Sequence, residues 1–101
     1  MDVNESLTEE PWKYYTPLTR AIFKSNVDEV RSLVESGADV NQNDKHGYLP
    51  LMIAVLSRNH EIVKILLDNG ADPDWGQTLS AAIEQGMTEI VKLLRAAGAH
   101  E

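Results

Sequence analysis

Apolar residues recur with the same spacing in three stretches of the chain. The stretches "AIFKSNVDEVRSLVESGA", "AVLSRNHEIVKILLDNGA" and "AIEQGMTEIVKLLRAAGA" align without gaps, and in each the Gly follows the first Ala by 16 positions (37 − 21, 70 − 54 and 98 − 82). Within each stretch Val and Leu recur at three- and four-residue intervals, which is the spacing of one helix face. A polar break divides each stretch, so the pattern predicts two short helices per unit.

Helix ends are marked by residues that suit them. Thr16-Pro17 places a side-chain oxygen before the first helix and a proline at its first position, where the missing N–H is not needed. Asn26, with Glu29 three residues on, is similar to a capping box and predicts the start of the second helix. The glycines that close the stretches predict left-handed helix ends.

The connections between the stretches differ in length. Successive units are 33 residues apart (54 − 21) and then 28 apart (82 − 54), and all five missing residues fall between Gly70 and Ala82. The first connection, "ADVNQNDKHGYLP", predicts an extended hairpin with its tip near residues 44–47. The second predicts only a tight turn, because Pro73 removes a backbone donor where a strand would begin. We therefore expect the third unit to act mainly as a cap.

These residues resemble the ankyrin repeat, a helix–turn–helix–hairpin unit of about 33 residues. Its T-P-L-x-x-A signature is present at 16–21, with variations at 49–54 and 77–82, and its G-A-D-x-N ending at 37–41 and, with variations, at 70–74. The resemblance covers about residues 15–99. The histidine usual after T-P-L is replaced by Thr19, Met52 and Ser80.

The resemblance implies an all-α fold, an ankyrin-repeat solenoid of paired antiparallel helices with one full β-hairpin loop. We divide the chain into a lead or capping segment, residues 1–15, and three units of about 16–43, 44–74 and 75–101. The lead ends with Trp12, Tyr14 and Tyr15. These aromatic residues either cover the open side of the first unit or form a partner-binding patch.

Composition and charge narrow the function. The 101 residues suit one small domain, and no apolar run approaches the roughly 20 residues of a membrane-spanning helix. The chain has no cysteine and its first residues are acidic, unlike a signal peptide, so we expect a cytoplasmic protein. A formal charge of −7 weighs against nucleic-acid binding and favours basic protein partners. We expect a monomer that binds no membrane.

Patterns that carry catalysis or metal binding are missing from the sequence. His60-Glu61 begins like a zinc-protease helix, but the second histidine is replaced by Lys64. No phosphate-binding Gly-rich loop and no G-x-S-x-G elbow are present. We interpret the acidic cluster Asp68, Asp72 and Asp74 as part of a solvated turn. We therefore expect no enzyme, no cofactor and no metal site.

The resemblance implies protein binding through hairpin tips and the concave side of the first helices. Carried onto this sequence, that surface consists of Phe23, Lys24, Lys45, His46, Tyr48, Leu56, Ser57, Trp75, Gln77, Glu84 and Gln85. We expect Tyr48 to contact the partner, because aromatic residues often anchor interfaces. For Leu56 and Trp75, packing where the connection is short and contact with a partner both stay open.

We expect a non-catalytic protein–protein interaction module that binds one protein partner through its hairpin tip and concave helix surface. The alternative is a dedicated inhibitor or immunity-type protein that covers a basic enzyme, such as a toxin, with its acidic surface. Self-association through an open end of the stack is a third possibility.

Overall fold

A computed structural model describes residues 15–45, 47–74 and 78–99 of the chain. This part contains no strand, and its helices are α2 (Pro17–Phe23), α3 (Val27–Glu35), α4 (Pro50–Leu56), α5 (His60–Asp68), α6 (Thr78–Glu84) and α7 (Thr88–Ala96). The first helix of every unit has seven residues and the second has nine. The third unit therefore keeps both of its helices at full length, as the sequence pattern predicts.

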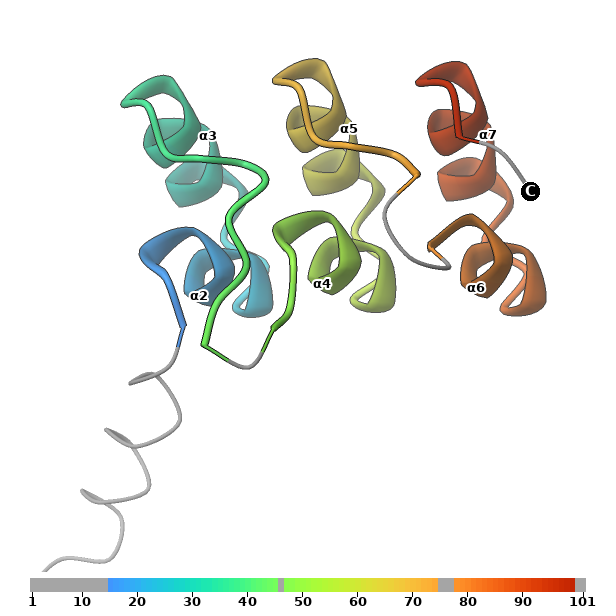
Figure 1. The fold of residues 1–101 in the computed structure, drawn as a ribbon, viewed down its shortest axis with the longest axis horizontal. Coiled ribbons are helices and arrows are strands. Elements are labelled where there is room, and N and C mark those ends of the chain that lie inside the picture. The colour runs from blue at the N-terminus through green and yellow to red at the C-terminus, as the bar shows by residue number, and fades with distance from the viewer. Residues whose placement is uncertain (1–14, 46, 75–77, 100–101) are drawn as a thin grey trace, which may run out of the picture.

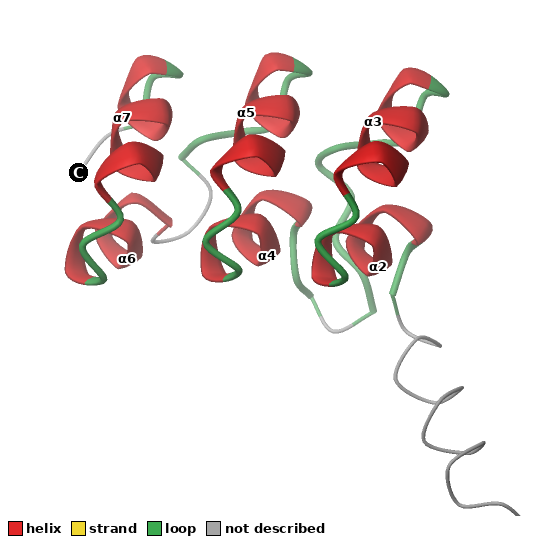
Figure 2. Cartoon of the chain, turned by 180° about the vertical axis from the view of Figure 1, so that it is seen from behind, coloured by secondary structure: helices red, strands yellow, loops and turns green. Residues whose placement is uncertain are grey.

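The helices form two parallel layers, as Figure 1 shows. Helices α2, α4 and α6 lie side by side in one layer, which we call the first-helix layer, and α3, α5 and α7 form the second-helix layer. Each first helix contacts the second helix of its own unit, and each helix contacts its counterpart in the next unit. The view from behind in Figure 2 shows the same three pairs joined by short turns. The all-helical repeat stack that the sequence predicts is thus confirmed.

The core lies between the two layers, and the middle unit contributes most of its large, fully buried side chains. Ile62, Val63 and Leu66 of α5 are completely buried, because α5 has a neighbouring helix on each side. Ala54 and Ala82 are also completely buried, and these small side chains let neighbouring first helices approach closely. Since each unit packs only on its neighbours, stability is close to a sum of unit and interface contributions.

Side-chain caps fix several helix starts. The predicted N-cap Thr16 accepts a hydrogen bond at Oγ1 from the Thr19 N–H (3.0 Å), and the Thr16 N–H donates to Thr19 Oγ1 (2.9 Å). Thr19 is completely buried. Although it replaces the usual histidine, its side chain still takes part in hydrogen bonds at the start of the helix. Asn26 caps α3 as predicted, accepting from the Glu29 N–H (3.2 Å), and Asn59 caps α5 in the same way (3.1 Å from the Ile62 N–H).

The turn inside each unit contains one left-handed residue. Ser25 and Arg58 have φ values of 57° and 58°, and Gly86 occupies the same position in the third unit with φ 69°. Non-glycine residues rarely take this conformation, because Cβ approaches the backbone. At the ends of the second helices the predicted glycines are left-handed too, for example Gly70 at φ 94°.

The two inter-unit connections are tied together by the side chain of Asn41. Its Nδ2 donates to the Gly70 carbonyl (3.0 Å), and its Oδ1 accepts from the Asp72 N–H (2.9 Å). Both partners belong to the next connection along the stack, 29 and 31 residues away. The amide thereby fixes the spacing of the two connections on this side of the molecule.

Candidate binding surface

Side chains at the ends of the first helices form rows that run along the stack. Phe23, Leu56 and Glu84 are the last residues of α2, α4 and α6, so the repeat places them in one row. The residues that follow them, Lys24, Ser57 and Gln85, form the next row. All six are exposed. The row changes in character along the stack, because the apolar side chains of the first two units give way to a carboxylate in the third.

A groove with apolar walls lies between the first and second units. It has a volume of about 360 Å³ and is lined by Tyr15, Phe23, Tyr48, Met52, Ile53, Leu56 and Ser57. The lining contains no carboxylate, ammonium or guanidinium group. Phe23, Tyr48 and Leu56 are 56%, 45% and 62% exposed, although each is a large hydrophobic side chain. Exposed apolar surface concentrated in one groove is typical of a protein interaction site.

The structure thus brings together four of the residues that the sequence predicts for binding, namely Phe23, Tyr48, Leu56 and Ser57. It adds Met52 and Ile53, which the sequence analysis did not assign to the site. Met52 occupies the position where the ankyrin signature has histidine, and its flexible thioether chain can adapt to different apolar ligands. The available signal in the sequence was the replacement of the usual histidine by methionine.

One wall of the groove is built from aromatic side chains on both units. Tyr15 contacts Phe23 with ring centroids 5.7 Å apart and planes tilted by 35°. Tyr48 comes from the connection before α4, so the groove spans the boundary between the units. Of the aromatic residues at the end of the lead, Tyr15 therefore lines the candidate site, whereas Trp12 and Tyr14 lie outside the described residues.

The loop that carries Tyr48 is closed by Asp44. The Asp44 N–H donates to the Tyr48 carbonyl (3.0 Å), and the Tyr48 N–H donates to Asp44 Oδ1 (3.1 Å). The Asp44 carbonyl accepts from Gly47 (3.0 Å), whose φ of 87° permits the tight turn. The predicted loop and its tip are present, but residues 38–45 and 47–49 contain no strand. Hydrogen bonds made by Asp44 take the place of the strand pairing that was expected of a β-hairpin. Lys45 is exposed at the tip of the loop.

The second connection is short, as the sequence predicts. Its Asp72 accepts a hydrogen bond at Oδ1 from the Asp74 N–H (2.9 Å), and α6 begins at Thr78. The tight turn predicted for this connection includes residues 75–77, so it stays a prediction. Trp75 and Gln77, two predicted binding residues, lie among these three and outside the described residues, as does His46 in the first loop.

Comparison with known proteins agrees with the repeat geometry. A family model described as "Ankyrin repeats (3 copies)" matches residues 2–76. The chain belongs to the ankyrin-repeat family. Ankyrin repeats are generally protein–protein interaction modules and are typically non-catalytic.

A solved ankyrin-repeat domain from Acinetobacter baumannii AYE is similar to this chain in fold, with a TM-score of 0.77 and 33% sequence identity. The match covers 82% of this chain and 47% of that structure, so the chain spans about half of its length. No sequence among the curated proteins matches the chain.

Three other predicted residues of this ankyrin chain, Glu84, Gln85 and Lys24, are not part of the groove lining. Glu84 and Gln85 are exposed on the third unit, where Gln85 Oε1 accepts a hydrogen bond from Arg58 Nη2 (3.2 Å). This bond ties the exposed turns of the second and third units together. Lys24 is exposed directly after Phe23, beside the groove lining.

The acidic cluster of the sequence divides into separate structural roles. Asp68 forms an ion pair with Lys64 on α5 (3.7 Å), whereas Asp72 bonds the turn that contains Asp74. The described residues contain no group of three or more His, Asp or Glu side chains that could hold a metal ion. In the same part of the chain, none of the helices has the length and apolar character needed to cross a membrane.

A second hollow, between α3 and α5, has a different character. It has a volume of about 430 Å³ and is lined by several charged side chains, among them Arg31, Glu35, Glu61 and Lys64. Mixed charges of this kind are usual on a solvated helix surface. The apolar groove is therefore the better candidate for binding.

Proposed function

We propose that this ankyrin-repeat chain is a non-catalytic module that binds one protein partner through the groove between its first and second units. The observation that carries the proposal is the gathering of Phe23, Tyr48 and Leu56, all largely exposed, around one apolar hollow. Keeping three such side chains in water is unfavourable, and a partner that covers them recovers the hydrophobic contribution. Docking on a rigid surface needs no chemistry from the module.

The shape of the stack supports docking on the first two units. The projecting loop that carries Lys45 and Tyr48 lies next to the groove, whereas the connection to the third unit has five residues fewer. We propose that the partner contacts mainly the first two units and that the third unit closes the stack. We further propose that the module is a cytoplasmic monomer, which cell fractionation and sedimentation would test.

An inhibitor or immunity-type protein that covers a basic enzyme receives less support. Such a protein would need carboxylates on its docking face, and the groove lining has none. Exposed carboxylates are found instead on the inter-unit connections, at Asp39, Asp72 and Asp74, and on the second-helix layer, for example at Glu61. An acidic inhibitor would dock through those surfaces and not through the groove.

The test uses the chain as bait in a native extract. Tyr48 and Lys45 are changed together to alanine, and the matched control is Ile83→Ser, an exposed apolar residue on α6 outside the groove. We expect a partner that is captured by the original and the control chains and lost by the double variant. The melting temperature of the double variant should fall by only a few degrees, because both side chains are exposed, Tyr48 by 45%. A melting temperature lowered by many degrees would make the residues structural and the proposal wrong.

A further inference from the structure

The charges of the chain are unevenly divided between its two helix layers. The first-helix layer and its turns (15–25, 48–58 and 78–86) have a formal charge of +2 (3 − 1). The cations are Arg20, Lys24 and Arg58, and the carboxylate is Glu84. The second-helix layer (26–36, 59–69 and 87–97) has four Lys or Arg against six carboxylates, which gives −2 (4 − 6). The described connections (38–45 and 71–74) add −3 (1 − 4).

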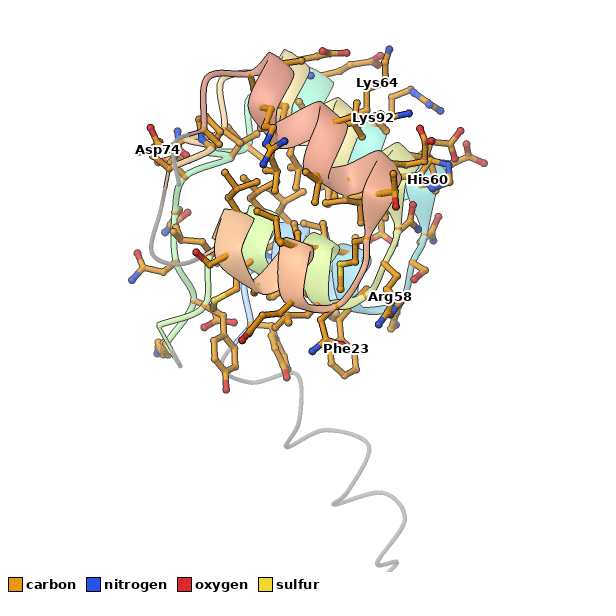
Figure 3. The ribbon with its side chains drawn as sticks, turned by 90° about the vertical axis from the view of Figure 1, so that its right-hand side faces the viewer. Phe23, Arg58, His60, Lys64, Asp74 and Lys92 are labelled. Carbon is orange, nitrogen blue, oxygen red and sulfur yellow. The ribbon has the colours of Figure 1, made fainter. Side chains whose placement is uncertain are left out.

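The charges of the second-helix layer are largely directed at one another. Arg31, Lys64 and Lys92 each form an ion pair with a carboxylate on their own helix, at 3.6, 3.7 and 3.8 Å. Figure 3 shows Lys64 and Lys92 on the opposite side of the molecule from Phe23 and Arg58. Among the described residues, the groove therefore opens in the layer where cations outnumber carboxylates. The whole chain has a formal charge of −7, of which −3 (1 − 4) belongs to residues 1–14, outside the described part.

Local charges decide what can dock in the groove. The Debye length at physiological ionic strength is about 8 Å, so exposed charges on the far layer are largely screened at the groove. Lys24 directly follows the lining residue Phe23, and Arg58 directly follows the lining residue Ser57. Both cations are exposed, and Arg58 also donates a hydrogen bond to Gln85 Oε1 of the third unit. Glu84 belongs to the same row as Phe23 and Leu56 but lies on the third unit, where it repels a carboxylate of the ligand.

We propose that the groove binds a short acidic segment of a partner protein, which inserts a large apolar side chain between Phe23, Tyr48 and Leu56. Its flanking carboxylates face Lys24 and Arg58, at the level of the first two units. The apolar contact supplies most of the affinity, whereas the charges supply selectivity and a faster association. The inference rests on the proposed function, and it reverses the expectation of a basic partner that the net charge of the sequence favours.

The test measures binding of designed peptides to the full chain by titration calorimetry. The probe is an eight-residue peptide with a central Trp-Leu pair, a glycine on each side and two glutamates at each end. One comparison peptide has lysine in place of glutamate, and another has Ala-Ala in place of Trp-Leu. We expect the acidic Trp-Leu peptide to bind about tenfold more tightly than the basic one at low salt, with a smaller ratio in 0.5 M salt. The Ala-Ala peptide should not bind measurably.

Two pairs of charge reversals separate the local cations from the overall charge. Lys24→Glu with Arg58→Glu should reverse the preference between the acidic and basic peptides. The matched control, Lys64→Glu with Lys92→Glu, changes the net charge equally on the opposite layer and should leave the preference in place. If both pairs shift the preference equally, the recognition is not local and the inference is wrong.

The outcomes also distinguish failure of this inference from failure of the proposed function. If the basic peptide binds more tightly and Leu56→Ser abolishes its binding, the groove is a docking site but the acidic partner is wrong. If no peptide binds at millimolar concentration, or if Leu56→Ser leaves peptide binding unchanged, the groove itself is wrong. Displacement of the peptide by a thymidine oligonucleotide would assign the cations to a nucleic acid, and concentration-dependent self-association blocked by the peptide would assign the groove to a second copy. Either result overturns the inference.

Discussion

Two leucines of this chain should respond very differently to the same substitution. Leu66 on α5 is completely buried, whereas Leu56 at the end of α4 is 62% exposed. Leu66→Ala removes buried methyl groups and leaves a cavity, so we expect a loss of about 3–5 kcal/mol of unfolding free energy. For a domain of this size that corresponds to a fall of at least about 10 °C in melting temperature.

Leu56→Ala should cost much less. Burying a whole leucine side chain contributes about 1.5–3 kcal/mol, and only the shielded fraction of Leu56, a little over a third, counts toward this. Alanine keeps Cβ and has a slightly higher helix propensity, so we expect a net loss of about 0.5 kcal/mol. The corresponding fall in melting temperature is about 2–4 °C.

Thermal and urea unfolding followed by circular dichroism would measure both changes. The reasoning also requires that Leu56→Ala weakens partner or peptide binding severalfold, because the exposed leucine is kept for contact and not for packing. Equal losses of stability for the two variants would refute this interpretation. They would mean that Leu56 packs against part of the molecule and that the groove is filled in solution.

Four further substitutions test the fold by urea denaturation. We expect Gly70→Ala to lower the unfolding free energy by about 1–2 kcal/mol, and Gly86→Ala to lower it by less. An added Cβ would meet no other part of the molecule within 4 Å at either position, so the loss comes from backbone conformation. The loss is greater for Gly70, with φ 94°, than for Gly86, with φ 69°. Asn41→Ala should cost about 1–2 kcal/mol, because it removes the hydrogen bonds to the Gly70 carbonyl and the Asp72 N–H. Thr19→Val should cost about 1 kcal/mol through loss of its capping bond. A neutral result for any of them would contradict the role assigned to that residue.

The repeat stack could be predicted because its determinants are local and occur three times. Three local features predict the same helices: apolar residues at helical spacing, N-caps such as Thr16 and Asn26, and a glycine after each second helix. The smaller number of residues in the second connection is a property of the sequence itself, whereas the tight turn expected there includes residues 75–77 and stays a prediction. Such features need no knowledge of which residues meet across the fold.

What the sequence could not predict depends on contacts between units. The groove requires side chains from two units to meet, and Met52 becomes part of it only through its position on α4 next to Tyr48. The bonds of Asn41 to the next connection join backbone groups about 30 residues away. The division of charge between the layers could not be predicted for a related reason, because a sum over the chain does not show which layer each charge occupies.

The loop before α4 shows how local chemistry can replace an expected pattern. Its composition is typical of a hairpin, and the sequence predicts strands on both sides of the tip. In the structure Asp44 bonds both backbone groups of Tyr48 and leaves no strand in the described part of the loop. An aspartate side chain competes with a backbone ladder in this way when a turn lies close by.

The most direct test of the central claim is a methyl NMR titration of the full chain with the acidic Trp-Leu peptide. The account predicts that the largest shift changes occur at Met52 and Leu56, in the groove between the first two units. The methyl groups of Ile65 on the second-helix layer and of Ile83 on α6 should change little. If the largest changes occur at Ile65 or Ile83 while Met52 and Leu56 stay unmoved, the chain binds its ligand elsewhere and the account is contradicted.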